Sequence, residues 1–85
     1  MPTMLNVKES LQVSYLGAFI STGKRQIGVP FLIKNITDNI LNVEILPLSG
    51  EKWITTTIYP GWNPEICIGV NISDETTQAA IQYGY

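Results

Sequence analysis

Eighty-five residues, of which 45% are hydrophobic and 14% charged, form one small folded domain, because disordered segments are less apolar and more charged than this. The net charge of −2 and the lack of a basic block exclude the electrostatic footprint of a nucleic-acid-binding protein. Histidine is absent and Cys67 is the single cysteine, which excludes an intrachain disulfide and a Cys/His zinc site.

The beginning of the chain differs in pattern from the rest. Residues 1–9 mix apolar side chains such as Met4 and Leu5 with polar ones without a period, so they are predicted to form an arm that a neighbouring molecule orders. Residues 10–85 are predicted to form a single β domain. The start of the chain does not resemble a signal peptide, and no apolar run reaches the roughly 18 residues that cross a bilayer. We therefore expect a protein made in a cytoplasm, with no membrane as partner.

Alternation of apolar and polar residues predicts a series of short strands. The expected strands are 10–20, 26–34, 40–46, 53–59 and 65–72, joined by turns at 21–24, 35–39 and 47–50. The side chains predicted to face the core are Leu11, Val13, Tyr15, Ile27, Val29, Phe31, Ile33, Leu41, Val43, Ile45, Ile66, Ile68, Val70 and Ile72. Gly28 and Pro30 occupy the other side of their strand, which indicates a bulge or an edge position.

The stretch from Trp53 to Pro64 is predicted to organise the fold. Its three consecutive threonines favour a strand, because β-branched side chains lose χ1 freedom in a helix. Pro60 cannot donate to a sheet, and Pro-Gly is a strong turn dipeptide, so the strand is expected to end there in a tight corner. Trp62 then lies at the apex of this corner. It either folds back to cap the core or stays exposed as an aromatic anchor for a partner.

The last segment fits two structures. Ser73 could cap a short helix over residues 76–82. Against this, Thr77, Ala79, Ile81, Tyr83 and Tyr85 alternate as in a strand. We favour a terminal strand and expect no helix longer than about two turns.

No group of residues supports catalysis, a metal or a cofactor. The segment 17–25 fails as a phosphate-binding loop, because five residues rather than four separate its glycines and no helix is predicted after it. Asp38 stands alone, and Asp74 and Glu75 are adjacent to each other, so these carboxylates lack the spacing of a divalent-cation site. Cys67, between two isoleucines, is predicted to be a buried or sheet-face thiol. We therefore expect no enzymatic activity, no cofactor and no metal.

Six or seven short strands predict an all-β fold, either a sandwich or a partly open barrel. Residues 31–45, with an apolar strand, Asn35-Ile36-Thr37-Asp38 and a second strand, resemble immunoglobulin-like sandwich domains. The Pro60-Gly61 corner before the next strand is similar to a corner of the same domains. The Cys…Trp…Cys core of that family is absent, so the resemblance implies architecture alone.

A second resemblance concerns residues 59–65, Tyr-Pro-Gly-Trp-Asn-Pro-Glu, together with the Tyr-Gly-Tyr end. These are similar to small β-rich virion proteins of tailed bacteriophages, in particular auxiliary or head-decoration proteins of crAss-like phages that infect Bacteroides. The resemblance implies a structural component of the virion, bound to the major capsid protein or to a fibre or ring protein, with self-association into a homo-oligomer as a further option. The competing hypothesis is a ligand-binding or adhesion module that recognises carbohydrate or protein through exposed aromatic side chains.

The two hypotheses share one set of candidate contact residues. These are Trp62, Trp53, Tyr59, Asn63, Tyr83, Tyr85, Met4 and Leu5.

Overall fold

A computed structural model describes residues 13–85, which form one antiparallel sheet with a single short helix between its last two strands. The predicted all-β fold is confirmed. Within this range the strands are β1 (Leu16–Ala18), β2 (Gly23–Arg25), β3 (Phe31–Asn35), β4 (Leu41–Pro47), β5 (Ile54–Ile58), β6 (Gly61–Ile72) and β7 (Ile81–Gly84), and the helix is α2 (Glu75–Ala80). No helix in this range is long and apolar enough to cross a bilayer.

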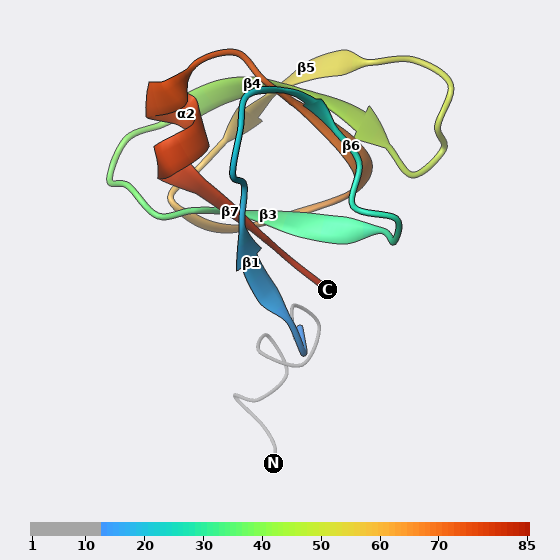
Figure 1. The fold of residues 1–85 in the computed structure, drawn as a ribbon, viewed down its shortest axis with the longest axis horizontal. Helices are drawn as coiled ribbons and strands as arrows, with labels where there is room; N and C mark the ends of the chain where they lie inside the picture. Colours follow the sequence, from blue (N-terminus) through green and yellow to red (C-terminus); the bar gives the residue numbers. More distant parts are fainter. Residues whose placement is uncertain (1–12) are drawn as a thin grey trace.

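The strands follow the order β1-β7-β3-β6-β4-β5, with β2 also paired to β6. The sheet is not closed, and its two ends are β1 and β5. It curves so that β3 and β4 lie on opposite sides of the interior, while α2 covers one end (Figure 1). This arrangement is compatible with the sandwich-like domain that the sequence predicts.

The 12-residue strand β6 connects the whole sheet. Its first half pairs with β3, from Asn35 opposite Gly61 to Phe31 opposite Cys67. Its second half pairs with β4 on one edge and with the short β2 on the other. A single strand can serve three neighbours in this way because it is more than twice the usual strand length.

Strand β6 has two register shifts, and one of them changes which of its side chains face the core. The pairing with β3 shifts between Phe31 and Ile33, and the pairing with β4 shifts between Leu46 and Pro47. The shift against β3 adds two residues of β6, so the same face stays inward and Asn63 and Cys67 are both buried. The shift against β4 adds one residue, which turns the following side chains to the other face. The prediction for Val70 is therefore confirmed, whereas that for Ile66 is wrong, since Ile66 is 47% exposed.

The other residues of β6 show the same change of phase. Cys67 is buried, in agreement with the prediction. Regular alternation would instead place its neighbours Ile66 and Ile68 in the core. Ile68 is only partly buried and lies away from the core cluster, so its predicted core position is wrong. Ile72 is buried as predicted.

The predicted strand 26–34 is interrupted. Only its second half forms β3, where Phe31 and Ile33 are each 1% exposed, as expected. Residues 26–30 leave the sheet, because Gly28 adopts a φ of 99° and Pro30 has no N–H to donate. Val29 is consequently 40% exposed, and its predicted core position is wrong.

The segment before residues 26–30 also pairs with the sheet. Residues 23–24, predicted to belong to the turn 21–24, are part of β2, which pairs with β6.

The first predicted strand, 10–20, is shorter than expected among the described residues, where β1 covers only Leu16–Ala18. Leu11 is outside the described residues, and strand pairing begins at Leu16, where β1 lies against β7. Tyr15 is 47% exposed rather than buried, since it lies at the outermost strand of the sheet, which has no further strand to cover it.

The end of the chain combines the two predicted alternatives. Residues 75–80 form the helix, so the strand prediction is wrong for them, and residues 81–84 form the predicted strand. Asp74, not Ser73, caps the helix: its carboxylate accepts a hydrogen bond of 2.7 Å from the Thr77 N–H, which lowers the pKa of Asp74. The helix has six residues, within the expected limit of two turns.

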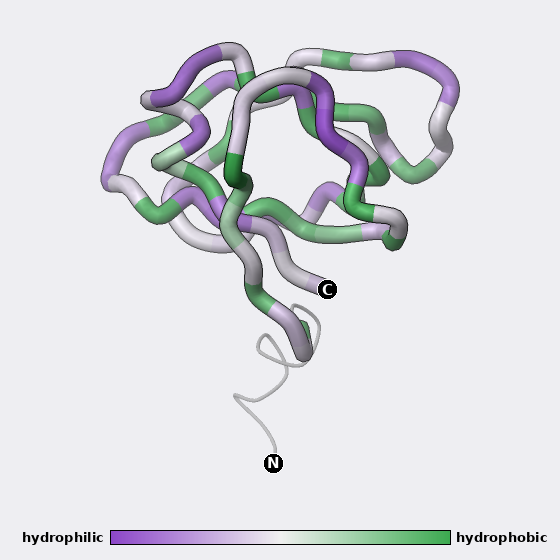
Figure 2. Tube along the Cα trace, in the orientation of Figure 1, coloured by the Kyte–Doolittle hydropathy of each residue, from purple (hydrophilic) through white to green (hydrophobic). Residues whose placement is uncertain are grey.

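One apolar cluster lies on the inner face of the sheet. Its buried members are Phe19, Phe31, Ile33, Val43, Ile45, Ile58, Cys67, Val70, Ile72, Ala80 and Ile81. Each large aliphatic or aromatic side chain in it contributes about 1.5–3 kcal/mol through burial. Figure 2 shows hydrophobic colours along most of β3 and strongly hydrophilic colours in β2.

Candidate interaction surface

Three strand glycines provide the space that three aromatic side chains occupy. A Cβ built at Gly84 would lie 2.5 Å from Cη2 of Trp62, one at Gly69 would lie 2.9 Å from Cη2 of Trp53, and one at Gly17 would lie 2.6 Å from the Tyr83 ring. None of these three glycines has a positive φ. They are therefore required for the close approach of a ring and not for backbone conformation.

Trp62 does not lie at the apex of a corner. It belongs to β6, where it is opposite Lys34 on the face away from the core, and its ring lies over Gly84 two strands away. The Lys34 ammonium is 5.7 Å from the ring centroid. The structure thus favours the folded-back alternative, although Trp62 packs on the outer face of the sheet and not on the core.

Trp53 has the same arrangement at the other end of the sheet. Its ring lies over Gly69, and the Lys24 ammonium is 4.9 Å from the ring centroid. Both tryptophans are half-buried, and both are covered by a cation in a favourable geometry. Both rings are thus held in place by contacts within the chain.

Asn63 is not a surface residue, so its place among the contact candidates is wrong. It is 3% exposed, and its side chain closes the corner between β5 and β6. Its Oδ1 accepts from the Tyr59 N–H at 3.0 Å, and its Nδ2 donates to the carbonyls of Tyr59 and Gly61 at 2.9 and 3.1 Å. The Asn63 side chain therefore supplies the hydrogen bonds that a neighbouring strand would make, at a corner where Pro60 has no N–H to donate.

Asn35 organises the neighbouring connection in a similar way. It is 2% exposed, its Nδ2 donates to the Asn39 carbonyl at 2.7 Å, and its Oδ1 accepts from the Thr37 N–H at 2.9 Å. The Asn-x-Thr pattern seen in the sequence is thus a turn built on a buried asparagine side chain.

The remaining candidates on the corner and the arm have different positions. Tyr59 follows β5 directly and is 57% exposed, so its ring is open to a partner. Met4 and Leu5 lie outside the described residues.

A cluster of three tyrosines lies where the sheet ends at β1. We define the tyrosine cluster as Tyr15, Tyr83 and Tyr85. The ring centroids of Tyr15 are 6.0 Å from Tyr83 and 5.2 Å from Tyr85, and the Tyr83 and Tyr85 rings are parallel within 7°. Tyr15 is 47% and Tyr85 42% exposed, so two of the three rings present a broad surface to solvent.

The core supports this cluster from behind. Tyr83 lies 4.9 Å from the centroid of Phe19 and 6.0 Å from that of Phe31, and both phenylalanines are buried. Backbone hydrogen bonds between Tyr15 and Tyr85, at 2.9 and 3.1 Å, join the two chain segments that carry the exposed rings. Partial burial and the neighbouring Tyr15 hydroxyl raise the pKa of Tyr83. The cluster is therefore a rigid aromatic surface with little rotamer freedom left to lose on binding.

Sequence reasoning found Tyr83 and Tyr85 but assigned Tyr15 to the core. The two segments are 70 residues apart in the chain, and only the β1–β7 pairing brings them together. The aromatic–glycine alternation in Tyr15-Leu16-Gly17 and Tyr83-Gly84-Tyr85 is the signal that could have related them.

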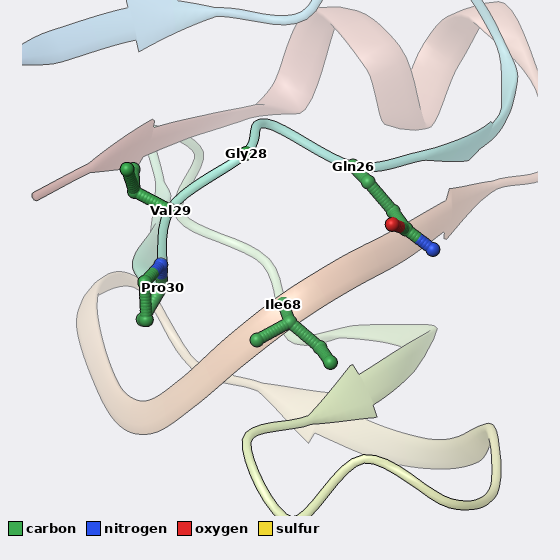
Figure 3. A pocket seen from close by; sticks show the side chains of 5 residues that line it. All are labelled: Gln26, Gly28, Val29, Pro30 and Ile68. Atoms are coloured by element: carbon green, nitrogen blue, oxygen red, sulfur yellow. The ribbon is translucent and has the colours of Figure 1, made fainter.

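The described residues provide little for small-molecule chemistry. Within residues 13–85 no group of three or more His, Cys, Asp or Glu side chains could hold a metal ion. A shallow pocket of about 170 Å³ lies between the 26–30 excursion and β6 (Figure 3). It is lined by Gln26, Gly28, Val29, Pro30 and Ile68. Its lining is mostly apolar and carries no ionisable group.

Comparison with protein-family models, with curated proteins and with solved structures finds no match for this chain.

Proposed function

We propose that this chain is a non-catalytic structural protein that binds another protein through the tyrosine cluster. Tyrosine offers a large contact area at a small cost in conformational entropy, and it is enriched in protein interfaces. Here the rings are already fixed by one another and by Phe19.

The setting that we propose is the particle of a tailed bacteriophage. This part of the proposal rests on the resemblance of residues 59–65 and of the chain end to auxiliary or head-decoration proteins. The partner is then the major capsid protein or another virion protein, and the protein acts in the virion after synthesis in the host cytoplasm. The small core is consistent with this role, because binding to a partner adds stability to a domain of this size.

Incorporation into particles tests the proposal. Tyr15→Ser and Tyr85→Ser are expected to lower the particle-bound fraction by about tenfold or more, the usual effect of truncating an aromatic anchor. Ile36→Ser is the control, since Ile36 is 49% exposed and lies in the connection between β3 and β4. The measurement is the amount of each tagged variant in purified virions, with circular dichroism to verify folding.

Two outcomes would contradict the proposal. If the wild-type protein is absent from purified virions, the virion setting is wrong. If both tyrosine variants are incorporated as well as Ile36→Ser, the partner contacts another surface.

A carbohydrate-binding module is the second candidate, and the parallel rings of Tyr83 and Tyr85 favour it. Flat aromatic surfaces pack against sugar rings as they do against protein side chains. A change in intrinsic fluorescence on titration with oligosaccharides, lost in Tyr85→Ser, would support this candidate. Binding to virions with no response to any oligosaccharide would support the first.

A further inference from the structure

Strand β5 is an edge without the usual protection. It forms one end of the sheet and pairs, among the described residues, with β4 alone. Its register is unbroken from Ile54 opposite Ile45 to Ile58 opposite Leu41. Natural edge strands are commonly blocked by a lysine, a proline or a bulge, and β5 contains none of these between its ends. The Ile58 carbonyl already accepts from Asn35 Nδ2, so the outer backbone groups of residues 54–57 are the ones available to another strand.

The side chains around this edge are arranged symmetrically. Residues 53–59 read Trp-Ile-Thr-Thr-Thr-Ile-Tyr, which is aromatic–Ile–Thr–Thr–Thr–Ile–aromatic in both directions. We propose that β5 pairs in antiparallel fashion with β5 of a second copy of this chain, so that two copies form a symmetric dimer centred on Thr56. The proposal does not depend on which partner the tyrosine cluster binds.

In this register, similar side chains lie opposite each other on both faces of the joined sheet. Thr56 lies opposite Thr56 of the second copy, and Ile54, 47% exposed, lies opposite the buried Ile58. On the other face Trp53 lies opposite Tyr59, which is 57% exposed. Directly opposite β-branched and aromatic pairs of this kind stabilise antiparallel sheets.

The charges also permit the pairing. Residues 53–64 contain no charged side chain. In the proposed register Lys52 falls opposite Pro60 and Glu51 opposite Gly61 of the second copy, so no two like charges face each other. A strand from an unrelated protein could use the same backbone groups, but only a second copy repeats the reversed order of side chains. The occupant that fits this edge best is therefore the chain itself.

Charge substitution at the centre of the dimer tests the register. Residue 56 meets itself, so Thr56→Lys places two ammonium groups opposite each other and Thr56→Glu two carboxylates. Each variant alone is expected to dimerise about tenfold or more weakly than the wild type, whereas an equimolar mixture is expected to dimerise again. The measurement is sedimentation equilibrium of the full chain, whose monomer mass is 9.4 kDa.

Cysteine cross-linking provides a second test with a control in the same strand. Thr56→Cys is expected to give a disulfide-linked dimer on mild oxidation, because opposite Cβ atoms in such a pair lie about 5 Å apart. Thr55→Cys is expected to cross-link much more slowly, since residue 55 faces residue 57 of the second copy. Native Cys67 is 1% exposed and does not compete in the folded protein.

Three results would overturn the proposal. The first is a wild-type chain that sediments as a monomer throughout the micromolar range. The second is a dimer that Thr56→Lys and Thr56→Glu leave unchanged. The third is equally fast cross-linking of Thr55→Cys and Thr56→Cys. None of these results bears on virion binding, so failure of the dimer and failure of the proposed function can be told apart.

Discussion

At the scale of single residues, two buried asparagines stabilise the connections between β3 and β4 and between β5 and β6. Asn35 and Asn63 are the only buried polar side chains among the described residues, and both bond to backbone groups that a proline or a turn leaves unpaired. No buried side-chain nitrogen or oxygen in this part of the chain lacks a hydrogen-bond partner. The core therefore tolerates two amides because each is fully satisfied.

The contribution of Asn63 can be measured directly. Asn63→Ala removes three hydrogen bonds to Tyr59 and Gly61 and leaves the Tyr59 N–H unpaired. We expect the free energy of unfolding to fall by about 2–4 kcal/mol in urea titration. Asn42→Ala is the control, because Asn42 is exposed and accepts one bond of 3.1 Å from Thr57. A loss no greater than that of the control would show that the corner does not depend on Asn63.

The single thiol gives a prediction about pH. Burial, with a smaller effect of Glu65, raises the pKa of Cys67 from 9.0 to about 12. The folded protein keeps this proton where the unfolded chain releases it, so the stabilisation is complete below pH 9.0 and is lost as pH rises toward 12. We expect the wild type to lose more stability than Cys67→Ala between about pH 8 and pH 11, by up to about 1.4 kcal/mol per pH unit. Parallel losses in thermal melts of the two proteins would contradict this.

At the scale of elements, each exposed-face tryptophan depends on a glycine in another strand. The Trp62 ring lies over Gly84 of β7, and the Trp53 ring lies over Gly69 of β6. Each ring covers backbone that would otherwise be open, and the glycine has no side chain to obstruct it. These contacts join strands that are not neighbours in the sheet order.

The coupling between Trp62 and Gly84 is testable by a double-mutant cycle. Gly84→Ala places a methyl group 2.5 Å from the ring, so we expect it to reduce the free energy of unfolding by about 1–3 kcal/mol. In a Trp62→Leu background the same change is expected to cost clearly less, because the obstructing ring is gone. Additive effects of the two substitutions in urea titration would show that the ring and the glycine do not interact.

At the scale of the whole molecule, the fold is stabilised by one apolar cluster on the inner face of a curved sheet. Val70, a member of this cluster, is 0% exposed. A domain of this size has only about 5–15 kcal/mol of net stability, so a buried unpaired charge is enough to unfold it.

Two substitutions test directly which side chains of β6 face the core. Val70→Asp is expected to abolish soluble expression, because its carboxylate would be buried without a partner. Ile66→Asp is expected to be tolerated, since Ile66 is 47% exposed although simple alternation assigns it to the same face as Val70. The measurement is the soluble yield and the melting temperature of each variant. Equal effects of the two substitutions would mean that the bulge opposite β4 does not change the face.

Much of the fold could be predicted from the chain itself. Strands β4 and β5 and the connection between β3 and β4 lie within a residue or two of their predicted places, because their alternation is regular and their turns contain asparagine, glycine or proline. The interruption at Gly28 and Pro30 was indicated by the residues but its extent was not. Of the candidate surface, Tyr83 and Tyr85 were identified, while Tyr15 was assigned to the core.

The sequence by itself determined the all-β character and most of the residues in the core, because side-chain alternation and β-branched content are local properties. Only the tertiary structure decided which way β6 faces on each side of the bulge opposite β4, because a register shift depends on the strands beside it. The same holds for the aromatic side chains. Their rings rest on glycines of distant strands, so their exposure is decided by packing partners that no local pattern reveals.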